Sequence, residues 1–214
     1  MNLEETFGQI YATNSWKSEE SVSGQGSTLE ATAAIRKVLP HIFKAYDIRS
    51  ILDIPCGDFA WWNEMGINDL ITGEDVMRKP DKWFDYTGAD IVPELIRKNR
   101  EKFSGQKFLE LDLVTGTLPK VDLVFCRDCL GHLSNANVRL AVKNIKASGA
   151  KYLMATTFTD PKWSLDMDIL DGEWRPINMM KGAGYALGEP ILLINEGFTK
   201  NMEYHDKSLG LWKL

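Results

Sequence analysis

Residues 51–59 read Ile51-Leu52-Asp53-Ile54-Pro55-Cys56-Gly57-Asp58-Phe59, an apolar run that ends in a carboxylate and is followed by a glycine turn. The β-rich run begins at Ile48 and is typical of a buried strand. Open α/β sheets bind ligands where their parallel strands end, so Asp53 and the turn behind it predict a ligand site. Gly57 lets the backbone approach that ligand closely, because glycine has no Cβ.

Further β-rich runs follow this strand, and segments of helical character separate most of them. We expect six more strands, at residues 86–91, 107–111, 121–126, 152–157, 191–195 and 209–214. Helices are expected from Pro93, since proline is common in a first helical turn, and over residues 135–147. The alternation predicts an α/β fold: a seven-stranded, mostly parallel sheet with helices on both faces. The last two strands have no helix between them, which predicts a C-terminal antiparallel strand.

The N-terminal region is polar but contains Phe7, Ile10, Tyr11 and Trp16. A free tail rarely carries so many large apolar side chains. We therefore expect residues 1–26 to form a docked arm or lid and residues 27–214 to form the main domain. At the start of that domain, Ser27-Thr28-Leu29-Glu30 fits a capping box for a helix. Pro40 falls within this helix and predicts a kink or a break.

The composition is that of a globular protein, with 214 residues, 44% apolar and 26% charged residues, and a net charge of −5. This mixture excludes disorder as the main state. The negative charge argues against a nucleic-acid partner, and no stretch approaches the roughly 18 apolar residues of a membrane span. The acidic N-terminus lacks an apolar signal core, and three cysteines make no disulfide framework. We expect a cytoplasmic protein without a membrane partner, and a homodimer is left open.

The turn after residue 54 is not the fingerprint of dinucleotide-binding proteins. G-x-G-x-x-G is absent, because Pro55 and Phe59 stand where glycines would be sought. Phe59, Trp61 and Trp62 would also crowd a pyrophosphate, which needs several glycines and a helix N-terminus. We therefore expect a ligand without phosphates, and an NAD-dependent oxidoreductase is the less favoured alternative for this fold.

The stretch 51–59 resembles the first motif of the class I S-adenosylmethionine-dependent methyltransferases, an apolar strand followed by an acidic residue and a glycine-rich turn. The resemblance extends in order over residues 48–157. It implies a Rossmann-like sheet, methyltransferase activity and S-adenosylmethionine as the cofactor. The family usually has three alternate glycines, and this chain departs from them at Pro55 and Phe59. A catalytically inactive cofactor-binding or assembly protein therefore stays open as an alternative.

The resemblance also implies roles for the acidic residues at the strand ends. Asp53 and Gly57 would lie near the amino-acid part of the cofactor, and Asp90 would bind both ribose hydroxyls. Asp112 would bind the adenine amino group, and Leu113 would lie against the ring. The remaining residues expected at the cofactor are Pro55, Cys56, Asp58, Ile91 and Arg127.

The position of the second strand has a competitor. Asp90 lies 37 residues after Asp53, whereas a short crossover takes about 20. Residues 71–76, with Asp75, have a similar strand-glycine-acid pattern only 22 residues after Asp53. We prefer Asp90 because a convincing helix follows it, and residues 72–84 then form an insertion or a loop that faces a partner.

The end of the fourth strand, Cys126-Arg127-Asp128-Cys129, would face the methyl group and the acceptor by the same resemblance. A hydroxyl acceptor must lose a proton, and Asp128 and His132 are the candidate catalytic bases. His132 has a structural alternative, as a cap or core histidine. The C-x-x-C pattern has no second cysteine pair, so no metal is expected.

The other wall of the acceptor pocket is expected from residues 159–178. Arg175 could anchor an anionic group, Trp174 could form an apolar wall, and Asn178 and Tyr11 complete the expected acceptor-binding set. Residues 23–27 and the region after strand five resemble a bacterial and phage-borne subgroup associated with surface glycans. Since the motifs of DNA amino- and cytosine-methyltransferases are absent after strand four, we expect O-methylation of a small-molecule or sugar acceptor.

Overall fold

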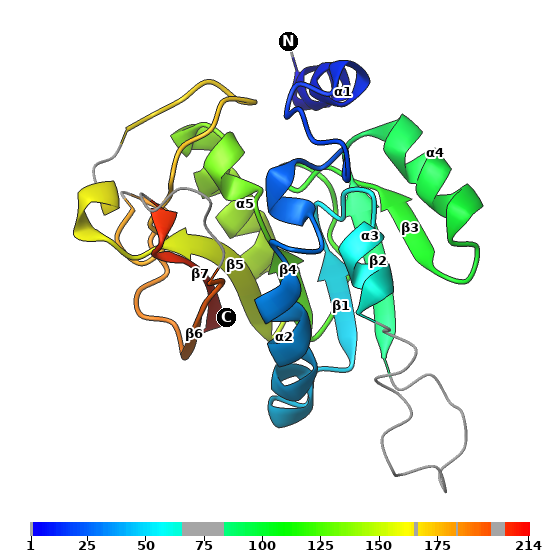
Figure 1. Ribbon diagram of the computed structural model, residues 1–214. Helices are drawn as coiled ribbons and strands as arrows, with labels where there is room; N and C mark the ends of the chain where they lie inside the picture. The colour runs from blue at the N-terminus through cyan, green and yellow to red at the C-terminus, as the bar shows by residue number, and fades with distance from the viewer. Residues whose placement is uncertain (1, 66–83, 165–166, 183, 198–203) are drawn as a thin grey trace, which may run out of the picture.

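The computed structural model describes residues 2–65, 84–164, 167–182, 184–197 and 204–214. Seven strands form one sheet in the order β3-β2-β1-β4-β5-β7-β6. Their bounds are β1 Ser50–Asp53, β2 Asp85–Asp90, β3 Lys107–Glu110, β4 Leu123–Cys126, β5 Tyr152–Phe158, β6 Leu192–Asn195 and β7 Lys207–Lys213. The expected α/β sheet is confirmed, and Figure 1 shows helices packed on both of its faces.

The strand order places a topological switch point between β1 and β4. β1 pairs in parallel with both β2 and β4, so the chain leaves β1 toward one edge and returns on the other side. Ligands of such sheets bind outside the carboxyl ends of the strands at this point. β7 pairs antiparallel with both β5 and β6, which confirms the expected antiparallel strand and terminal hairpin.

β2 confirms Asp90 as the end of the second strand. The strand runs from Asp85 to Asp90, and Asp53 stands opposite Gly88 in its parallel register with β1. The competing Asp75 and most of the predicted 72–84 insertion lie outside the described residues.

Two apolar cores flank the sheet. The helix α5, Asn135–Ala147, begins at the Ser134 cap and packs on one face through Val138, Ala141, Val142 and Ile145. The other face is covered by α2 (Ala33–Ala45), α3 (Ala60–Glu64) and α4 (Pro93–Lys102). Trp62 is fully buried on this second face, against Tyr86 of β2 and Phe125 of β4. The two cores leave the carboxyl edge of the sheet to the loops and the N-terminal arm.

The start of α2 corrects the expected capping box. Ser27 ends a short 3₁₀ turn, η1 (Gln25–Ser27), and its amide donates to Gly24 within that turn. The hydroxyl that accepts a helical-type bond is that of Thr28, from the amide of Ala31. The helix proper begins only at Ala33. Pro40 lies inside α2 without breaking it, so the expected split is wrong.

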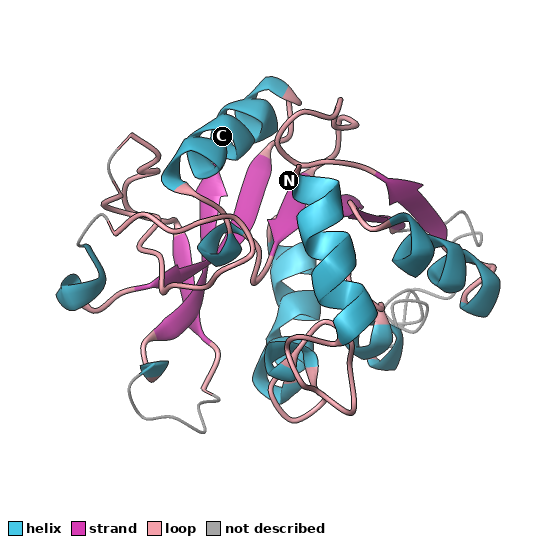
Figure 2. Cartoon of the chain, turned by 90° about the horizontal axis from the view of Figure 1, so that it is seen from above, coloured by secondary structure: helices cyan, strands magenta, loops and turns pink. Residues whose placement is uncertain are grey.

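The N-terminal arm is an ordered part of the fold. Its helix α1, Leu3–Thr13, begins with a capping box formed by Asn2 and Glu5. Figures 1 and 2 show α1 lying across the carboxyl edge of the sheet, between α4 and α5. The Lys98 ammonium on α4 donates to the Tyr11 hydroxyl at 2.9 Å, which ties the end of α1 to the main domain. Within the described residues, no helix has the length and apolar character needed to cross a membrane.

Candidate functional site

A cavity lies under α1 at the carboxyl ends of β1, β2 and β4. It encloses about 1060 Å³, including the open space at its mouth. The sequence-predicted residues that line it are Tyr11, Asp53, Pro55, Cys56, Gly57, Asp58, Asp90, Ile91, Asp112, Leu113, Arg127, Asp128 and His132. The structure therefore brings together thirteen side chains that were expected at one site.

Asp53 lies at the floor of the cavity and is almost completely buried. The Tyr86 hydroxyl donates to one of its carboxylate oxygens at 2.6 Å. Burial raises the pKa of Asp53 well above its usual value, and the bond from Tyr86 only partly offsets this. Tyr86 was missed by the sequence reasoning, although it lies on the strand that carries Asp90.

The turn after β1 fits tightly against the N-terminal arm. Gly57 has a φ of +54°, and its amide donates to Asp90 at 3.2 Å. A Cβ at position 57 would overlap the Ser23 hydroxyl, so glycine is required by both conformation and space. The same hydroxyl accepts a hydrogen bond from the Asp58 amide at 3.1 Å. Ser23 is therefore a site residue, although the sequence indicated residues 23–27 only through a resemblance and gave Ser23 no role in the site.

Asp90 points its carboxylate into the cavity from the end of β2. One oxygen accepts from the Gly57 amide at 3.2 Å and the other from the Val92 amide at 3.1 Å. Burial raises the pKa of Asp90 to about 6, against the opposing effect of these bonds. Each carboxylate oxygen can accept further bonds, so a vicinal diol could be held by both.

Asp112 occupies the end of the cavity beyond β3. Its carboxylate accepts from the Val114 amide at 2.7 Å and from the Thr115 hydroxyl at 2.5 Å. Apolar side chains surround this end of the cavity, among them Ile91 and Leu113. The result is an apolar slot with a hydrogen-bond acceptor at its edge, which suits a flat ring with an amino group.

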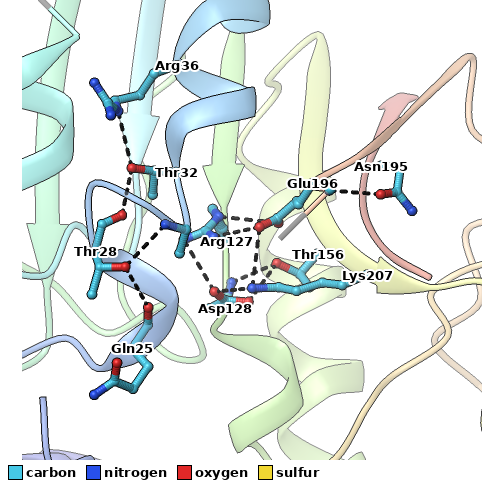
Figure 3. A network of polar contacts seen from close by, with 12 residues as sticks. Gln25, Thr28, Thr32, Arg36, Arg127, Asp128, Thr156, Asn195, Glu196 and Lys207 are labelled. Carbon is cyan, nitrogen blue, oxygen red and sulfur yellow. Dashed lines mark hydrogen bonds and ion pairs between the residues drawn. The ribbon is translucent and has the colours of Figure 1, made fainter. Parts of the chain in front are cut away.

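Arg127 and Asp128 begin the loop after β4 and are bound into ion pairs. The Arg127 guanidinium lies 2.6 Å from Glu196 and 3.3 Å from Asp128. Asp128 also accepts from the Lys207 ammonium at 2.6 Å (Figure 3). These two cations hold the pKa of Asp128 well below its usual range despite its burial. A carboxylate held in this way is a weak proton acceptor.

His132 lies in the same loop, at the end of the 3₁₀ turn η3 (Leu130–His132). Its Nδ1 is 2.9 Å from the carbonyl oxygen of Glu173. A carbonyl can only accept, so Nδ1 carries the proton and Nε2 keeps a lone pair. Burial lowers the pKa of His132, which favours the neutral ring. The Trp16 ring lies 5.4 Å from the imidazole, centre to centre.

The segment 168–175 packs against the loop that carries His132. None of its residues, all of which the structure describes, lines the cavity. The Arg175 guanidinium donates to the Leu133 carbonyl and to the Asn135 side chain, each at 2.7 Å, and its side chain is buried there. The structure therefore does not bring Arg175 into the cavity as an anion anchor, because its donors are engaged in fixing the loop.

Trp174 and Asn178 also lie outside the cavity wall. Trp174 is 45% exposed and packs edge-on against Phe158 and Tyr204. Asn178 is buried, and its side-chain oxygen accepts from the amides of Met180 and Lys181. The arm takes the place of these residues in the cavity wall, with Leu3, Phe7, Tyr11, Trp16, Val22 and Ser23. Its aromatic content was the signal for this contact.

The described residues hold no group of three His, Cys, Asp or Glu side chains arranged for a metal ion. Cys126 is buried at the end of β4, and its hydrogen bond with Cys129 and its burial raise the pKa of its thiol. Cys126 is therefore a poor source of a thiolate ligand.

Solved structures with similar folds include methyltransferases. Human N-acetylserotonin methyltransferase in complex with S-adenosylmethionine superposes with a TM-score of 0.61 at 15% identity. Two others contain S-adenosylhomocysteine: the N-methyltransferase NodS of Bradyrhizobium japonicum WM9 (0.57, 12%) and the 1,6-didemethyltoxoflavin-N1-methyltransferase of Burkholderia thailandensis (0.59, 12%). These alignments cover 100%, 95% and 99% of this chain, and 60%, 97% and 86% of the three proteins in turn.

The chain spans about three fifths of the human enzyme and nearly the whole of the NodS chain. No sequence-family model matches it, and no curated protein matches it by sequence. The fold is that of the class I S-adenosylmethionine-dependent methyltransferases, and the cavity lies at the switch point of that fold.

Proposed function

We propose that this chain transfers a methyl group from S-adenosylmethionine to a hydroxyl group of a small-molecule or sugar acceptor. The observation that carries the proposal is a single cavity that contains both the acidic ends of three strands and the neutral imidazole of His132. The first set suits an adenosyl group, and the second suits the removal of a proton.

The residues of the cavity fit the cofactor. Asp90 offers a carboxylate to the ribose hydroxyls, and Asp112 offers an acceptor to the adenine amino group beside the apolar Leu113. Gly57 and Asp53 both line the cavity, where they would lie near the amino-acid part of the cofactor. When bound, S-adenosylmethionine would supply an electrophilic methyl group, so this chain has to position and deprotonate the acceptor.

His132 is the residue best placed to accept that proton. The Glu173 carbonyl fixes the ring through Nδ1 and leaves Nε2 as the free base. The lowered pKa keeps the ring neutral near pH 7, the form that can accept a proton. Positioned bases of this kind contribute about 10²–10⁴-fold to proton-transfer reactions. Asp128 is a weaker candidate because its two cationic partners stabilise its ionised form.

The charges of the cavity favour an uncharged acceptor. Among the described residues that line it, Arg127 is the one with a permanent positive charge, and Glu196 and Asp128 already pair with it. An anionic group would therefore meet carboxylates without a free cation to balance it. The Trp16 ring beside His132 offers a flat apolar face that a sugar or aromatic ring can pack against.

Calorimetry tests the cofactor first. The full chain should bind S-adenosylmethionine and S-adenosylhomocysteine, and NADH should give no heat of binding. NADH binding with no response to either adenosyl ligand would favour an oxidoreductase and overturn the proposal.

Release of S-adenosylhomocysteine from S-adenosylmethionine in the presence of neutral sugars and phenols then tests methyl transfer. Turnover that His132→Gln abolishes supports a hydroxyl acceptor. Turnover with amines that is insensitive to His132→Gln would replace O-methylation with N-methylation, since an already neutral amine needs no base.

A further inference from the structure

A cluster of four charged side chains lies on the acceptor side of the cavity, just after the ends of β4 and β6 and at the start of β7. Arg127 and Lys207 supply two positive charges, and Asp128 and Glu196 supply two negative ones (Figure 3). Lys207 bridges the two acids, at 2.6 Å from Asp128 and 3.4 Å from Glu196. Glu196 and Arg127 are almost completely buried. Burying charged side chains costs desolvation free energy, so stability alone does not explain this cluster. We therefore ask what the cluster holds in position.

Asp128 is held in position through both its backbone and its side chain. It has a left-handed backbone conformation, with a φ of +52°, and its amide donates to the Thr156 hydroxyl at 2.8 Å. Its carboxylate is held by the two cations on one side. It cannot move without breaking these pairs, so it presents a rigid surface toward the cavity.

The N-terminal arm rests on this surface. Gly26, in the turn η1, packs so closely that a Cβ there would lie 2.7 Å from an Asp128 carboxylate oxygen and 3.6 Å from the Lys207 nitrogen. The arm makes two further contacts around the cavity: Trp16 lies beside His132, and Ser23 sits on Gly57 and Asp58. Trp16 and Ser23 line the cavity together with His132.

We propose that Asp128 is a positioning residue that docks the arm, with Lys207 and Arg127 holding its carboxylate in place. In this role Asp128 does not accept the proton of the acceptor. It keeps residues 14–27 closed over the acceptor side, where the Trp16 ring packs beside the His132 imidazole at 5.4 Å, centre to centre. Gly26 is required because any side chain would push the arm away from Asp128. The proposal goes beyond methyl transfer and holds for any ligand of the cavity.

Hydrogen exchange of the full chain, without cofactor or acceptor, tests the docking directly. Gly26→Ala should speed exchange in residues 14–27 by roughly tenfold, because the added methyl group overpacks the contact. Gly8→Ala is the matched control, since a Cβ at position 8 meets no atom within 4 Å and should leave these residues as protected as in the wild type. Wild-type protection of residues 14–27 in Gly26→Ala would overturn the proposal.

A second pair of variants tests the charge that fixes Asp128. Lys207→Arg keeps a cation beside the carboxylate and should preserve the protection of residues 14–27. Lys207→Met removes the cation and should speed their exchange while β5 and β1 stay protected. Equal protection in Lys207→Met and Lys207→Arg would show that Asp128 docks the arm without the Lys207 cation, which contradicts the proposal. Because no cofactor is present, these outcomes are independent of the proposed reaction.

Discussion

Asp90→Asn is the substitution that most sharply tests how the cavity would bind an adenosyl ligand. The ionised carboxylate of Asp90 can accept hydrogen bonds from both ribose hydroxyls, and bonds to a charged group contribute about 1.5–3 kcal/mol. Asparagine keeps the size of the side chain but loses the charge and one acceptor. The Kd for S-adenosylhomocysteine at pH 8 should therefore rise by roughly 10–150-fold.

The raised pKa of Asp90 adds a pH dependence to this prediction. The pKa of about 6, compared with the usual 3.8, means that ionising Asp90 costs the folded state on the order of 3 kcal/mol. The contribution of this group to stability is fully present below pH 3.8 and is lost as the pH rises through about 6. A diol that binds the ionised form lowers this pKa. Binding at pH 6 should therefore release a fraction of a proton, and wild-type affinity should fall about tenfold from pH 8 to pH 5.

Isothermal titration calorimetry in two buffers of different ionisation enthalpy measures both effects. Asp85→Asn is the control, because Asp85 is exposed at the opposite end of β2. It should bind like the wild type at every pH. Equal affinities of Asp90→Asn and the wild type at pH 8, or an unchanged proton release in Asp90→Asn, would refute the assignment of Asp90 to the ribose.

Three further substitutions have defined outcomes. His132→Gln should lower the rate of methyl transfer by roughly 10²–10⁴-fold without weakening S-adenosylhomocysteine binding. The wild-type rate should fall only below pH 6.5, because burial lowers the pKa of His132. Unchanged turnover in His132→Gln would show that His132 has a structural role. Gly57→Ala should lower the free energy of unfolding in urea by about 1–3 kcal/mol and weaken cofactor binding, because φ is +54° and Ser23 fills the space beside Gly57. An unchanged free energy of unfolding would show that the N-terminal arm can move away from position 57. Glu196→Ala should lower the free energy of unfolding in urea by about 3–5 kcal/mol, because it leaves Arg127 buried with a single partner. A decrease below about 1 kcal/mol would show that water takes the place of the Glu196 carboxylate beside Arg127.

The sheet and its acidic strand ends could be predicted because the signal is local and repeated. An apolar run that ends in an acidic residue, as at Asp53 and Asp90, indicates that the strand is buried and marks the residue at which it ends. Parallel strands bring such ends together at one edge whatever the loops do. The register of β1 with β2 confirms this reasoning, including the choice of Asp90 over a nearer competitor.

The acceptor side could be predicted less well because side-chain direction there depends on distant partners. Arg175 suggested an anion anchor, but the Leu133 carbonyl and Asn135 engage its guanidinium on the far side of the loop. The partners of Asp128 and Arg127 lie 79 and 69 residues further along the chain, at Lys207 and Glu196, and no local pattern connects them. The aromatic residues of the N-terminal arm indicated that it docks on the domain. Its contacts through Gly26 and Ser23 could not be predicted, because small residues such as these produce no apolar pattern in the sequence.

The most direct test of the central claim is a crystal structure of the full chain with S-adenosylhomocysteine. The account predicts both ribose hydroxyls within about 3.2 Å of the Asp90 carboxylate, the adenine beside Leu113 with its amino group toward Asp112, and the sulfur on the side of His132. An adenosyl group bound outside this cavity, or bound in it with the ribose turned away from Asp90, would contradict the account.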